Sequence, residues 1–315
     1  MRILVTGGAG FIGSHVADAL LARGHEVLVV DDLSTGSRAN VPARATFRQG
    51  DICDEAFLER VFDEFVPELV SHQAAQTSVA VSTREPVRDA TVNVIGSVQL
   101  LEQCVRRKVQ RIVYASTGGA VYGEVADGER ASVRHPARPL SPYACSKFAV
   151  ECYLGAYAKE YGLRSTVLRY ANVYGPRQDP HGEAGVVAIF TQRVVRGDGI
   201  QINARKENGD AGCVRDYVYV GDVVAYNCLA IDGALDAPIV NVCTGDATTT
   251  LDLARALGRV IGREPELSYA PRRPGDVERS VLFAEPEPRI QTTRLEEGLR
   301  KTVEWFNAAE QPASV

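Results

Sequence analysis

The sequence lacks the usual marks of a metal-binding or disulfide-bonded protein. Its 315 residues include seven cysteines, an odd number, without a Cys-x-x-Cys pair, and the five histidines do not cluster with the cysteines. Neither a zinc site nor a disulfide framework is therefore predicted. We expect no bound metal, and reduced thiols of the kind found in cytosolic proteins.

Long apolar runs and an excess of basic residues are also missing. No run reaches the ~18 apolar residues needed to cross a bilayer, and residues 1–6 meet Gly7 too early for a signal peptide. Lysine and arginine total 35 against 40 aspartates and glutamates, a formal net charge of −5. Proteins that bind nucleic acid through its phosphates are typically basic. We therefore expect a cytoplasmic protein with neither a nucleic-acid partner nor a membrane partner.

Short β-rich runs alternate with helical patterns through the first half of the chain. Between apolar runs at residues 3–6 and 27–30, Ile12, Val16 and Leu20 recur every four residues, as on one face of a helix. Repeated βα units this short predict an α/β fold, a doubly wound parallel sheet of the Rossmann type. Further helices are expected near 54–65, 91–107 and 143–161, and further strands near 68–72, 111–115 and 164–169.

The alternation of strands and helices ends after about residue 170, where proline, glycine and charged residues become more frequent. One later unit, a helix at 222–231 and a strand at 239–242, is expected to return to the sheet. We predict a dinucleotide-binding domain of residues 1–168 plus 221–245. A smaller, discontinuous α/β lobe of residues 169–220 plus 246–315 is expected to hold the substrate.

A glycine-rich turn, Gly7 to Gly13, follows the first strand and opens the first helix. Gly7 permits the tight turn, Gly10 lets the backbone approach a pyrophosphate, and Gly13 allows close helix–strand packing. The helix N-terminus offers N–H groups to the phosphates. Asp31 ends the next strand, where a carboxylate accepts hydrogen bonds from ribose hydroxyls and favours NAD over NADP. The alternative is a glycine turn that only packs a helix.

A tyrosine and a lysine stand four residues apart in the predicted helix 143–161. Residues at this spacing share a helix face, so Lys147 can lie beside Tyr143. A free phenol has a pKa near 10, and a neighbouring ammonium lowers it toward the range where tyrosine acts as a base. Ser116 and Thr117 follow the strand 111–115 and could share the substrate proton; capping a turn is their alternative role.

These motifs resemble those of the extended short-chain dehydrogenase/reductases and, among them, the UDP-glucose 4-epimerase family. The resemblance rests on the glycine turn, on Tyr143-Ala144-Cys145-Ser146-Lys147 and on Arg169-Tyr170-Ala171-Asn172-Val173-Tyr174-Gly175-Pro176, and it extends to Asp276. Related dehydratases and decarboxylases carry an acidic residue where this chain has Gly118-Gly119-Ala120. The resemblance implies inversion at C4 of a UDP-hexose through a 4-keto sugar, with tightly bound NAD.

The resemblance also implies roles for individual residues. Tyr143 and Lys147 are catalytic; because Gly118 occupies the position of the usual family hydroxyl, Thr117, or else Ser116, takes that role. The implied cofactor residues are Gly7, Gly10, Phe11, Ile12, Gly13, Asp31, Asp32, Ser34, Thr35, Gly36, Asp51, Ile52, Gln73, Ala74, Ala75, Gln76, Asn93, Tyr143, Lys147 and Tyr170. The implied substrate residues are Thr117, Asn172 and the pyrophosphate ligands Arg215 and Arg273, with Val186, Val187 and Phe190 against uracil, Asp276 at the ribose, and Ser280.

Ser280 stands where some family members carry a bulky tyrosine, so its small side chain is expected to leave room for an N-acetylated sugar. The resemblance further implies a homodimer formed through the helices 91–107 and 143–161. Two other functions stay open. Another NAD-dependent nucleotide-sugar enzyme, such as a UDP-glucuronate epimerase or a dTDP-sugar reductase or dehydratase, would differ in its sugar pocket. A non-catalytic NAD-sensing regulator would share the fold, but such proteins tend to lose the tyrosine–lysine pair.

Overall fold

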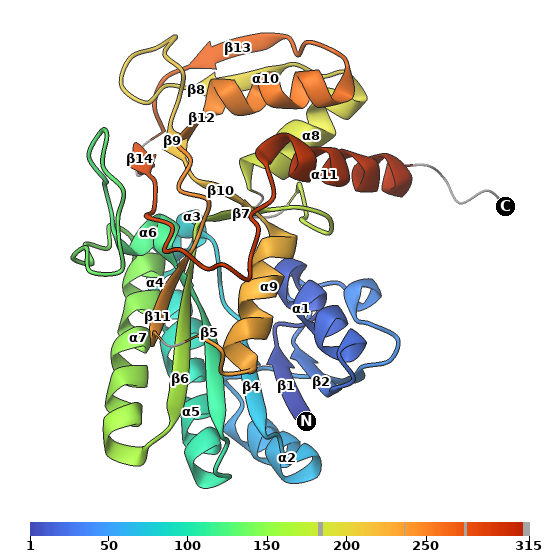
Figure 1. The fold of residues 1–315 in the computed structure, drawn as a ribbon, viewed down its shortest axis with the longest axis vertical. Coiled ribbons are helices and arrows are strands. Elements are labelled where there is room, and N and C mark those ends of the chain that lie inside the picture. The colour runs from blue at the N-terminus through green and yellow to red at the C-terminus, as the bar shows by residue number, and fades with distance from the viewer. Residues whose placement is uncertain (182–184, 236, 274–275, 311–315) are drawn as a thin grey trace, which may run out of the picture. The chain divides into compact units, whose positions relative to one another are not determined.

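The computed structural model describes residues 1–181, 185–235, 237–273 and 276–310, and the chain divides into two compact units (Figure 1). The first unit comprises residues 1–117, 139–169 and 224–240, and the second comprises 118–138, 170–223 and 241–315. The boundaries expected at 168, 220 and 245 differ from these by one, three and five residues. The segment 118–138, expected in the larger domain, groups with the second unit.

The first unit is built around a seven-stranded sheet with the order β11-β6-β5-β4-β1-β2-β3. β1 pairs in parallel with β2 on one side and with β4 on the other, so the strand order reverses at β1. This confirms the predicted doubly wound sheet, whose ligands bind beside such a reversal at the carboxyl ends of the strands. The strands are β1 (Arg2–Thr6), β2 (Glu26–Asp31), β3 (Thr46–Gln49), β4 (Leu69–His72), β5 (Arg111–Thr117), β6 (Arg164–Tyr170) and β11 (Ile239–Val242).

Helices pack against this sheet, and apolar side chains such as Leu4, Leu58, Leu100 and Ile112 are buried between the layers. The expected helix 91–107 is two elements: a π-helical turn, η2 (Thr91–Ile95), leads into α5. α7 packs against α3, α4, η2 and α5, and Figure 1 shows α5 and α7 side by side. The helical elements are α1 (Phe11–Ala22), η1 (Arg38–Asn40), α2 (Glu55–Phe65), α3 (Val79–Arg84), α4 (Pro86–Ala90), α5 (Gly96–Arg106), α7 (Pro142–Tyr161) and α9 (Val220–Ile231).

The second unit combines three packed helices with short strands. α8 (Val186–Arg196), α10 (Thr250–Ile261) and α11 (Leu295–Glu310) contact one another around a buried apolar cluster. No helix in the described ranges has both the length and the apolar character that crossing a bilayer requires. The remaining elements are α6 (Gly118–Val121), β7 (Asn172–Tyr174) paired with β10 (Tyr217–Tyr219), β9 (Val214–Arg215) between β12 (Thr248–Thr249) and β14 (Arg279–Ser280), and β8 (Ile200–Asn203) paired with β13 (Leu267–Ala270).

Candidate active site

Four of the predicted motifs follow the carboxyl ends of strands in the first unit. Thr6 ends β1 before the glycine turn, and Asp31 ends β2. His72 ends β4 before the loop Gln73–Gln76, and Thr117 ends β5. Because these strands are neighbours in one sheet, the motifs share one edge, where open α/β sheets bind their ligands.

The glycine turn has a geometry that only glycine permits. Gly7 has φ +69°, and a Cβ there would lie 2.5 Å from the backbone nitrogen of Ala74. A Cβ at Gly13 would lie 2.1 Å from the carbonyl oxygen of Gly7. The N-cap residue of α1 is Gly10, which supplies no side-chain cap, so N–H groups of the first helical turn can donate to phosphate. These residues fit the pyrophosphate of a dinucleotide.

The carboxylate of Asp31 is held at the end of β2. It is 8% exposed, and its two oxygens each accept a backbone hydrogen bond of 2.9 Å, from Ala9 and from Leu33. Burial raises the pKa of Asp31, and the two backbone donors oppose that rise. A Cβ at Gly36 would lie 2.8 Å from this carboxylate. Each carboxylate oxygen keeps further acceptor capacity, which suits a ribose hydroxyl.

The loop after β4 is fixed by side chains from two other elements. The amide of Gln73 donates to the side-chain oxygen of Asn227, at 3.0 Å. Asn93, in the π-helical turn, accepts from the Gln76 backbone nitrogen at 2.8 Å and donates to its carbonyl oxygen at 2.9 Å. Asn93 therefore pairs with the Gln76 peptide as a neighbouring strand would, and Ala74 and Ala75 lie within the fixed loop.

His72 links two parts of this edge in its neutral form. Its Nδ1 hydrogen-bonds with the Thr6 hydroxyl at 2.7 Å, and its Nε2 hydrogen-bonds with the Ser97 hydroxyl at 2.9 Å. The side chain is buried, and burial lowers the pKa of His72 to about 3, with the nearby Lys147 ammonium as a second cause. The imidazole is therefore uncharged at neutral pH and holds β1 to α5.

Other predicted cofactor residues differ in exposure. Phe11 and Ile12, at the start of α1, are half-buried, whereas Ile52 is buried against Gly96. Tyr170, which ends β6, is also buried, but it falls in the second unit. Asp51 is exposed and accepts from the Cys53 backbone nitrogen, Asp32 is exposed and accepts from Ser34, and Thr35 is exposed.

Lys147 is a buried cation one helical turn after Tyr143. Its ammonium donates to the carbonyl oxygen of Ala115 at 2.9 Å and lies 4.8 Å from the ring centre of Tyr114. Burial lowers the pKa of Lys147 to about 8, against the opposing effects of Asp89 and Glu151. The group therefore remains mainly charged at pH 7, where its positive charge favours a phenolate on the same face of α7.

The two predicted hydroxyls at the end of β5 have different surroundings. Ser116 is buried and donates to the carboxylate of Glu151, which also accepts from the Arg169 guanidinium at 3.0 and 3.1 Å. Glu151 and Arg169 are themselves buried. Thr117 is half-buried, and its hydroxyl makes no hydrogen bond to the described part of the chain. Of the two, Thr117 is the hydroxyl that can serve a ligand.

In the second unit, two predicted substrate residues, Arg215 and Ser280, lie on paired strands, and a third, Asn172, lies on β7, which pairs with β10. Arg215 stands opposite Ser280 where β9 pairs with β14, and the Asn172 amide donates to the carbonyl oxygen of Asp216 at 3.2 Å. The Arg215 guanidinium donates to the carbonyl oxygens of Val214, at 3.0 Å, and of Val277. This arrangement places Arg215 beside Ser280, while Asn172 bonds Asp216, the residue that follows Arg215.

The remaining predicted substrate residues are more scattered. Val187 and Phe190 are buried in the apolar cluster of the second unit, and Val186 is half-buried. Arg273 is exposed and Asp276 half-buried; residues 274–275 between them lie outside the described residues. The Ser280 side chain is 1% exposed, and its hydroxyl has no partner in the described ranges.

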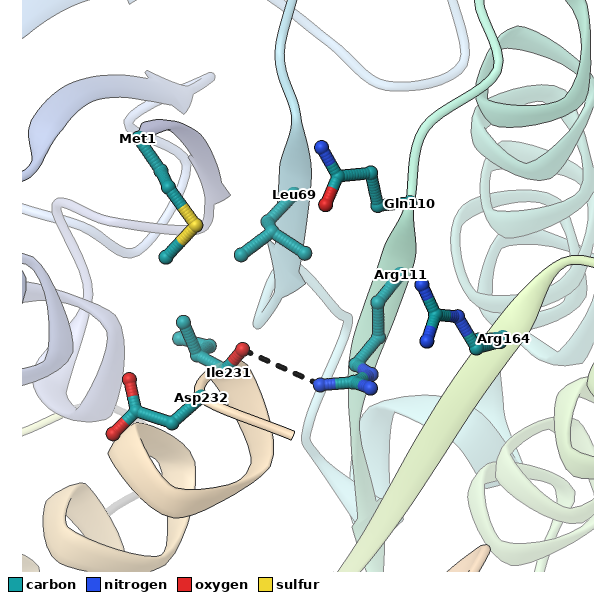
Figure 2. A pocket seen from close by; sticks show the side chains of 7 residues that line it. All are labelled: Met1, Leu69, Gln110, Arg111, Arg164, Ile231 and Asp232. Atoms are coloured by element: carbon teal, nitrogen blue, oxygen red, sulfur yellow. Dashed lines mark hydrogen bonds between the residues drawn. The ribbon is translucent and has the colours of Figure 1, made fainter. Parts of the chain in front are cut away.

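A pocket in the first unit lies at the amino-terminal ends of the strands, opposite the motifs (Figure 2). Leu69, Arg111 and Arg164 line it, and they begin β4, β5 and β6, respectively. Figure 2 shows Arg111 bonded to the carbonyl oxygen of Ile231 at the end of α9. The pocket therefore faces away from the motifs, which follow the carboxyl ends.

The sequence patterns assign no role to three buried residues near Lys147. Asp89 and Glu151 are its neighbouring carboxylates, and Ser146 donates to Asp89 at 2.5 Å. Two signals were present: Ser146 lies inside the tyrosine–lysine motif, and Glu151 follows Lys147 by one helical turn. Nothing in the local pattern marked Asp89, which lies on a five-residue helix.

The doubly wound sheet, the glycine turn and the tyrosine–lysine helix together define a dinucleotide-binding enzyme. The chain belongs to the NAD dependent epimerase/dehydratase family, whose model matches residues 3–243.

Individual relatives match over nearly the whole chain. A UDP-glucose 4-epimerase of Mycolicibacterium smegmatis is 42% identical and covers 99% of this chain and 100% of its own length. The structure of the Thermus thermophilus UDP-glucose 4-epimerase with NAD is 53% identical, with a TM-score of 0.90 over 98% of this chain and 100% of that one. The Thermotoga maritima UDP-glucose 4-epimerase with UDP-glucose is 47% identical, with a TM-score of 0.90 over 99% and 100%.

Proposed function

We propose that this chain interconverts UDP-hexoses of opposite configuration at C4, the UDP-glucose and UDP-galactose pair. The protein is an NAD-dependent epimerase of the family established above. The observation that carries the proposal is the Lys147 ammonium, buried and held on the Ala115 carbonyl one turn from Tyr143. That arrangement supports Tyr143 as a base near the carboxyl ends of the strands, where the cofactor motifs lie.

Tyr143 as phenolate takes the proton of the sugar C4 hydroxyl, and Thr117 assists because its hydroxyl has no other partner in the described chain. Lys147 keeps the phenolate accessible near neutral pH by placing a positive charge beside it. When bound, NAD supplies a reversible hydride acceptor, so that C4 is oxidised to a ketone and reduced again from the other face. Tyr143 then returns the proton.

The dinucleotide would be held by the glycine turn, by Asp31 and by the loop Gln73–Gln76. The steric limits at Gly7 and Gly13 support this, because a side chain at either position would displace the backbone that faces the phosphates. The carboxylate of Asp31, with its remaining acceptor capacity, would receive the adenosine ribose hydroxyls.

Residues of the second unit would bind the UDP part of the substrate. Arg215 and Arg273 would contact the pyrophosphate, since a planar guanidinium can donate to two phosphate oxygens at once. Asn172 would bind the sugar diphosphate and Asp276 the uridine ribose, while the uracil would lie against α8 near Val186. Anchoring UDP strongly leaves the sugar free to turn, so that binding energy is held away from the reacting carbon.

The size of the side chain at position 280 bears on the substrate range. Ser280 supports acceptance of N-acetylated UDP-hexoses, because its small side chain takes the place of a bulky one. A uronic acid substrate has no specific observation in its favour.

We also propose that the enzyme is a cytoplasmic homodimer. None of the seven cysteines, all of which lie in the described ranges, forms a disulfide, which suits a reducing compartment. Between residues 142 and 158 of α7 the charged side chains are Lys147 and Glu151, and both are buried. The exposed side of this stretch, which includes Cys145, Cys152 and Tyr153, is therefore uncharged, as expected for the core of an interface.

Proton NMR of the purified protein with UDP-galactose, without an added redox partner, tests the function. We expect the anomeric signal of UDP-glucose to appear and the same mixture to form from either sugar. Tyr143→Phe, which removes the base and keeps the ring, should lose at least about a hundredfold of this activity. An unchanged wild-type spectrum would contradict the proposal and redirect the assay to UDP-N-acetylglucosamine and UDP-glucuronate. Replacement of the C6 methylene signal by a methyl signal would indicate a dehydratase, and conversion of the C5 methine signal of UDP-glucuronate to a methylene signal would indicate a decarboxylase.

A further inference from the structure

Asp89 is a fully buried carboxylate on the short helix α4. A buried carboxylate is costly unless donors surround it. Here the side-chain amide of Gln76 donates to one oxygen at 2.7 Å, the Asn93 amide donates to the same oxygen at 3.0 Å, and the Ser146 hydroxyl donates to the other at 2.5 Å. The three donors come from the loop after β4, from the π-helical turn and from α7.

These donors belong to parts of the site with different tasks. Gln76 and Asn93 fix the loop proposed to contact NAD, because Asn93 also bonds the Gln76 peptide in both directions. Ser146 precedes Lys147 on the helix that carries Tyr143. One oxygen of Asp89 thus serves the cofactor loop, and the other serves the catalytic helix.

The position of the π-helical turn explains how one carboxylate reaches both parts. A π-turn has more residues than an α-turn, and such turns are frequent at functional sites. η2 follows α4 directly, and its Asn93 lies four residues after Asp89, so its amide reaches both the Asp89 carboxylate and the Gln76 peptide. The two short elements α4 and η2 thus connect the loop after β4 to α7 through hydrogen bonds.

We propose that Asp89 is a positioning residue that couples the cofactor loop to the Tyr143–Lys147 helix and supplies part of the negative charge around the buried Lys147. The proposal rests on the proposed function. Asp89 touches neither substrate nor cofactor; it acts through Gln76, Asn93, Ser146 and the Lys147 ammonium.

In the described part of the chain, five titratable groups lie around Lys147. Asp89 on α4 and Glu151 on α7 both favour its charged form. His72 on β4 is neutral, and Tyr114 on β5 presents its ring to the ammonium. Tyr143 lies on the same helix face. Glu151 is itself paired with Arg169 on β6, so Asp89 is the carboxylate near Lys147 that has neutral donors as its hydrogen-bond partners.

Two substitutions separate the charge of Asp89 from its hydrogen bonds. In Asp89→Asn the new amide nitrogen can face Ser146, whose hydroxyl can accept as well as donate, so the three contacts are kept and the charge is lost. We expect the alkaline limb of the kcat profile to move to lower pH by on the order of one unit. Glu85→Gln is the matched control, since Glu85 precedes α4 and pairs with Arg84 and Arg88 at the surface. It should leave the limb unchanged.

Asp89→Ala removes the hydrogen bonds as well, and we expect the purified folded chain to retain roughly tenfold less NAD. Ser146→Ala breaks the link to α7 alone and should retain more NAD than Asp89→Ala. An Asp89→Asn profile equal to that of wild type, or equal NAD retention in the two alanine variants, would overturn the proposal. If the wild type epimerises no UDP-hexose, the proposed function fails by itself, and the NAD content of the folded variants still decides the role of Asp89.

Discussion

The Ser116 hydroxyl donates to the buried carboxylate of Glu151, while the neighbouring Thr117 hydroxyl has no partner in the described chain. Thr117→Val, which keeps the shape and removes the hydroxyl, should therefore lower kcat by about a hundredfold, within the range attributed to a positioned proton-transfer group. Steady-state kinetics with UDP-galactose measure this effect.

Ser116→Ala is the paired variant. It removes one donor from the Glu151 carboxylate, so we expect a loss of about 1–3 kcal/mol in the free energy of unfolding and less than a tenfold loss in kcat. Thermal and urea unfolding measure the first quantity. The reverse pattern, with Ser116→Ala the slower enzyme, would assign the catalytic hydroxyl to Ser116.

The lowered pKa of Lys147 predicts that the enzyme loses activity at alkaline pH without a matching loss of stability. The pKa of Lys147 in the folded chain is about 8, below the ordinary value of 10.5. The ammonium therefore loses its proton as the pH rises above 8, and we expect kcat to decrease with a slope that approaches tenfold per pH unit. Between pH 8 and 10.5 the unfolded chain binds more protons at this group. Its contribution to stability therefore rises with pH, by at most about 1.4 kcal/mol per unit. Parallel pH profiles of kcat and of thermal unfolding test the two directions.

Lys147→Arg supplies the control for this assignment. A guanidinium does not titrate in this range, so the alkaline limb should disappear or move upward, although the larger planar group lowers the absolute rate. A limb that stays near pH 8 in this variant would belong to another group.

The central sheet and the cofactor motifs could be predicted because their signals are local. The buried strand Glu26–Asp31 contains an apolar run at residues 27–30, and the turn at Gly7 requires glycine. β3 was not predicted, since Thr46–Gln49 is an edge strand with mostly exposed side chains and no apolar run. The expected helix 91–107 had the right extent, but hydrophobic spacing does not distinguish a π-turn from an α-helix.

The charged groups around Lys147 could not be predicted from the sequence, for a different reason. Asp89 is 58 residues from Lys147 in the chain, and its burial depends on the packing of α4 against α7. The Ser116–Glu151 bond likewise joins a strand to a helix. Val187 and Phe190 follow the helical period but are buried in a core, because apolar residues at this spacing serve packing as readily as ligand contact.

Asp216 is a fully buried carboxylate in the second unit, held by several hydrogen-bond donors. It accepts hydrogen bonds from the Thr244 backbone nitrogen at 3.0 Å, from the Thr244 hydroxyl at 2.8 Å and from the Gly245 nitrogen at 2.9 Å. Asp216→Asn places an amide N–H against these donors, and we expect a loss of about 2–4 kcal/mol in the free energy of unfolding. Asp246→Asn, at a nearby exposed position, should change it by less than about 0.5 kcal/mol. Calorimetry or urea unfolding distinguishes them.

The exposed, uncharged side of α7 predicts that two copies of the chain pack together through this helix. Ala156 is exposed there, eleven residues after Cys145 and four after Cys152, so the three lie along one side of the helix. If a second copy covers this side, Ala156→Glu buries a charge without a partner and should convert a dimer into a monomer in sedimentation experiments. Tyr269→Glu, at an exposed aromatic of β13 in the second unit, should leave the mass unchanged. A wild-type chain that sediments as a monomer, or a dimer that tolerates Ala156→Glu, would place any interface elsewhere.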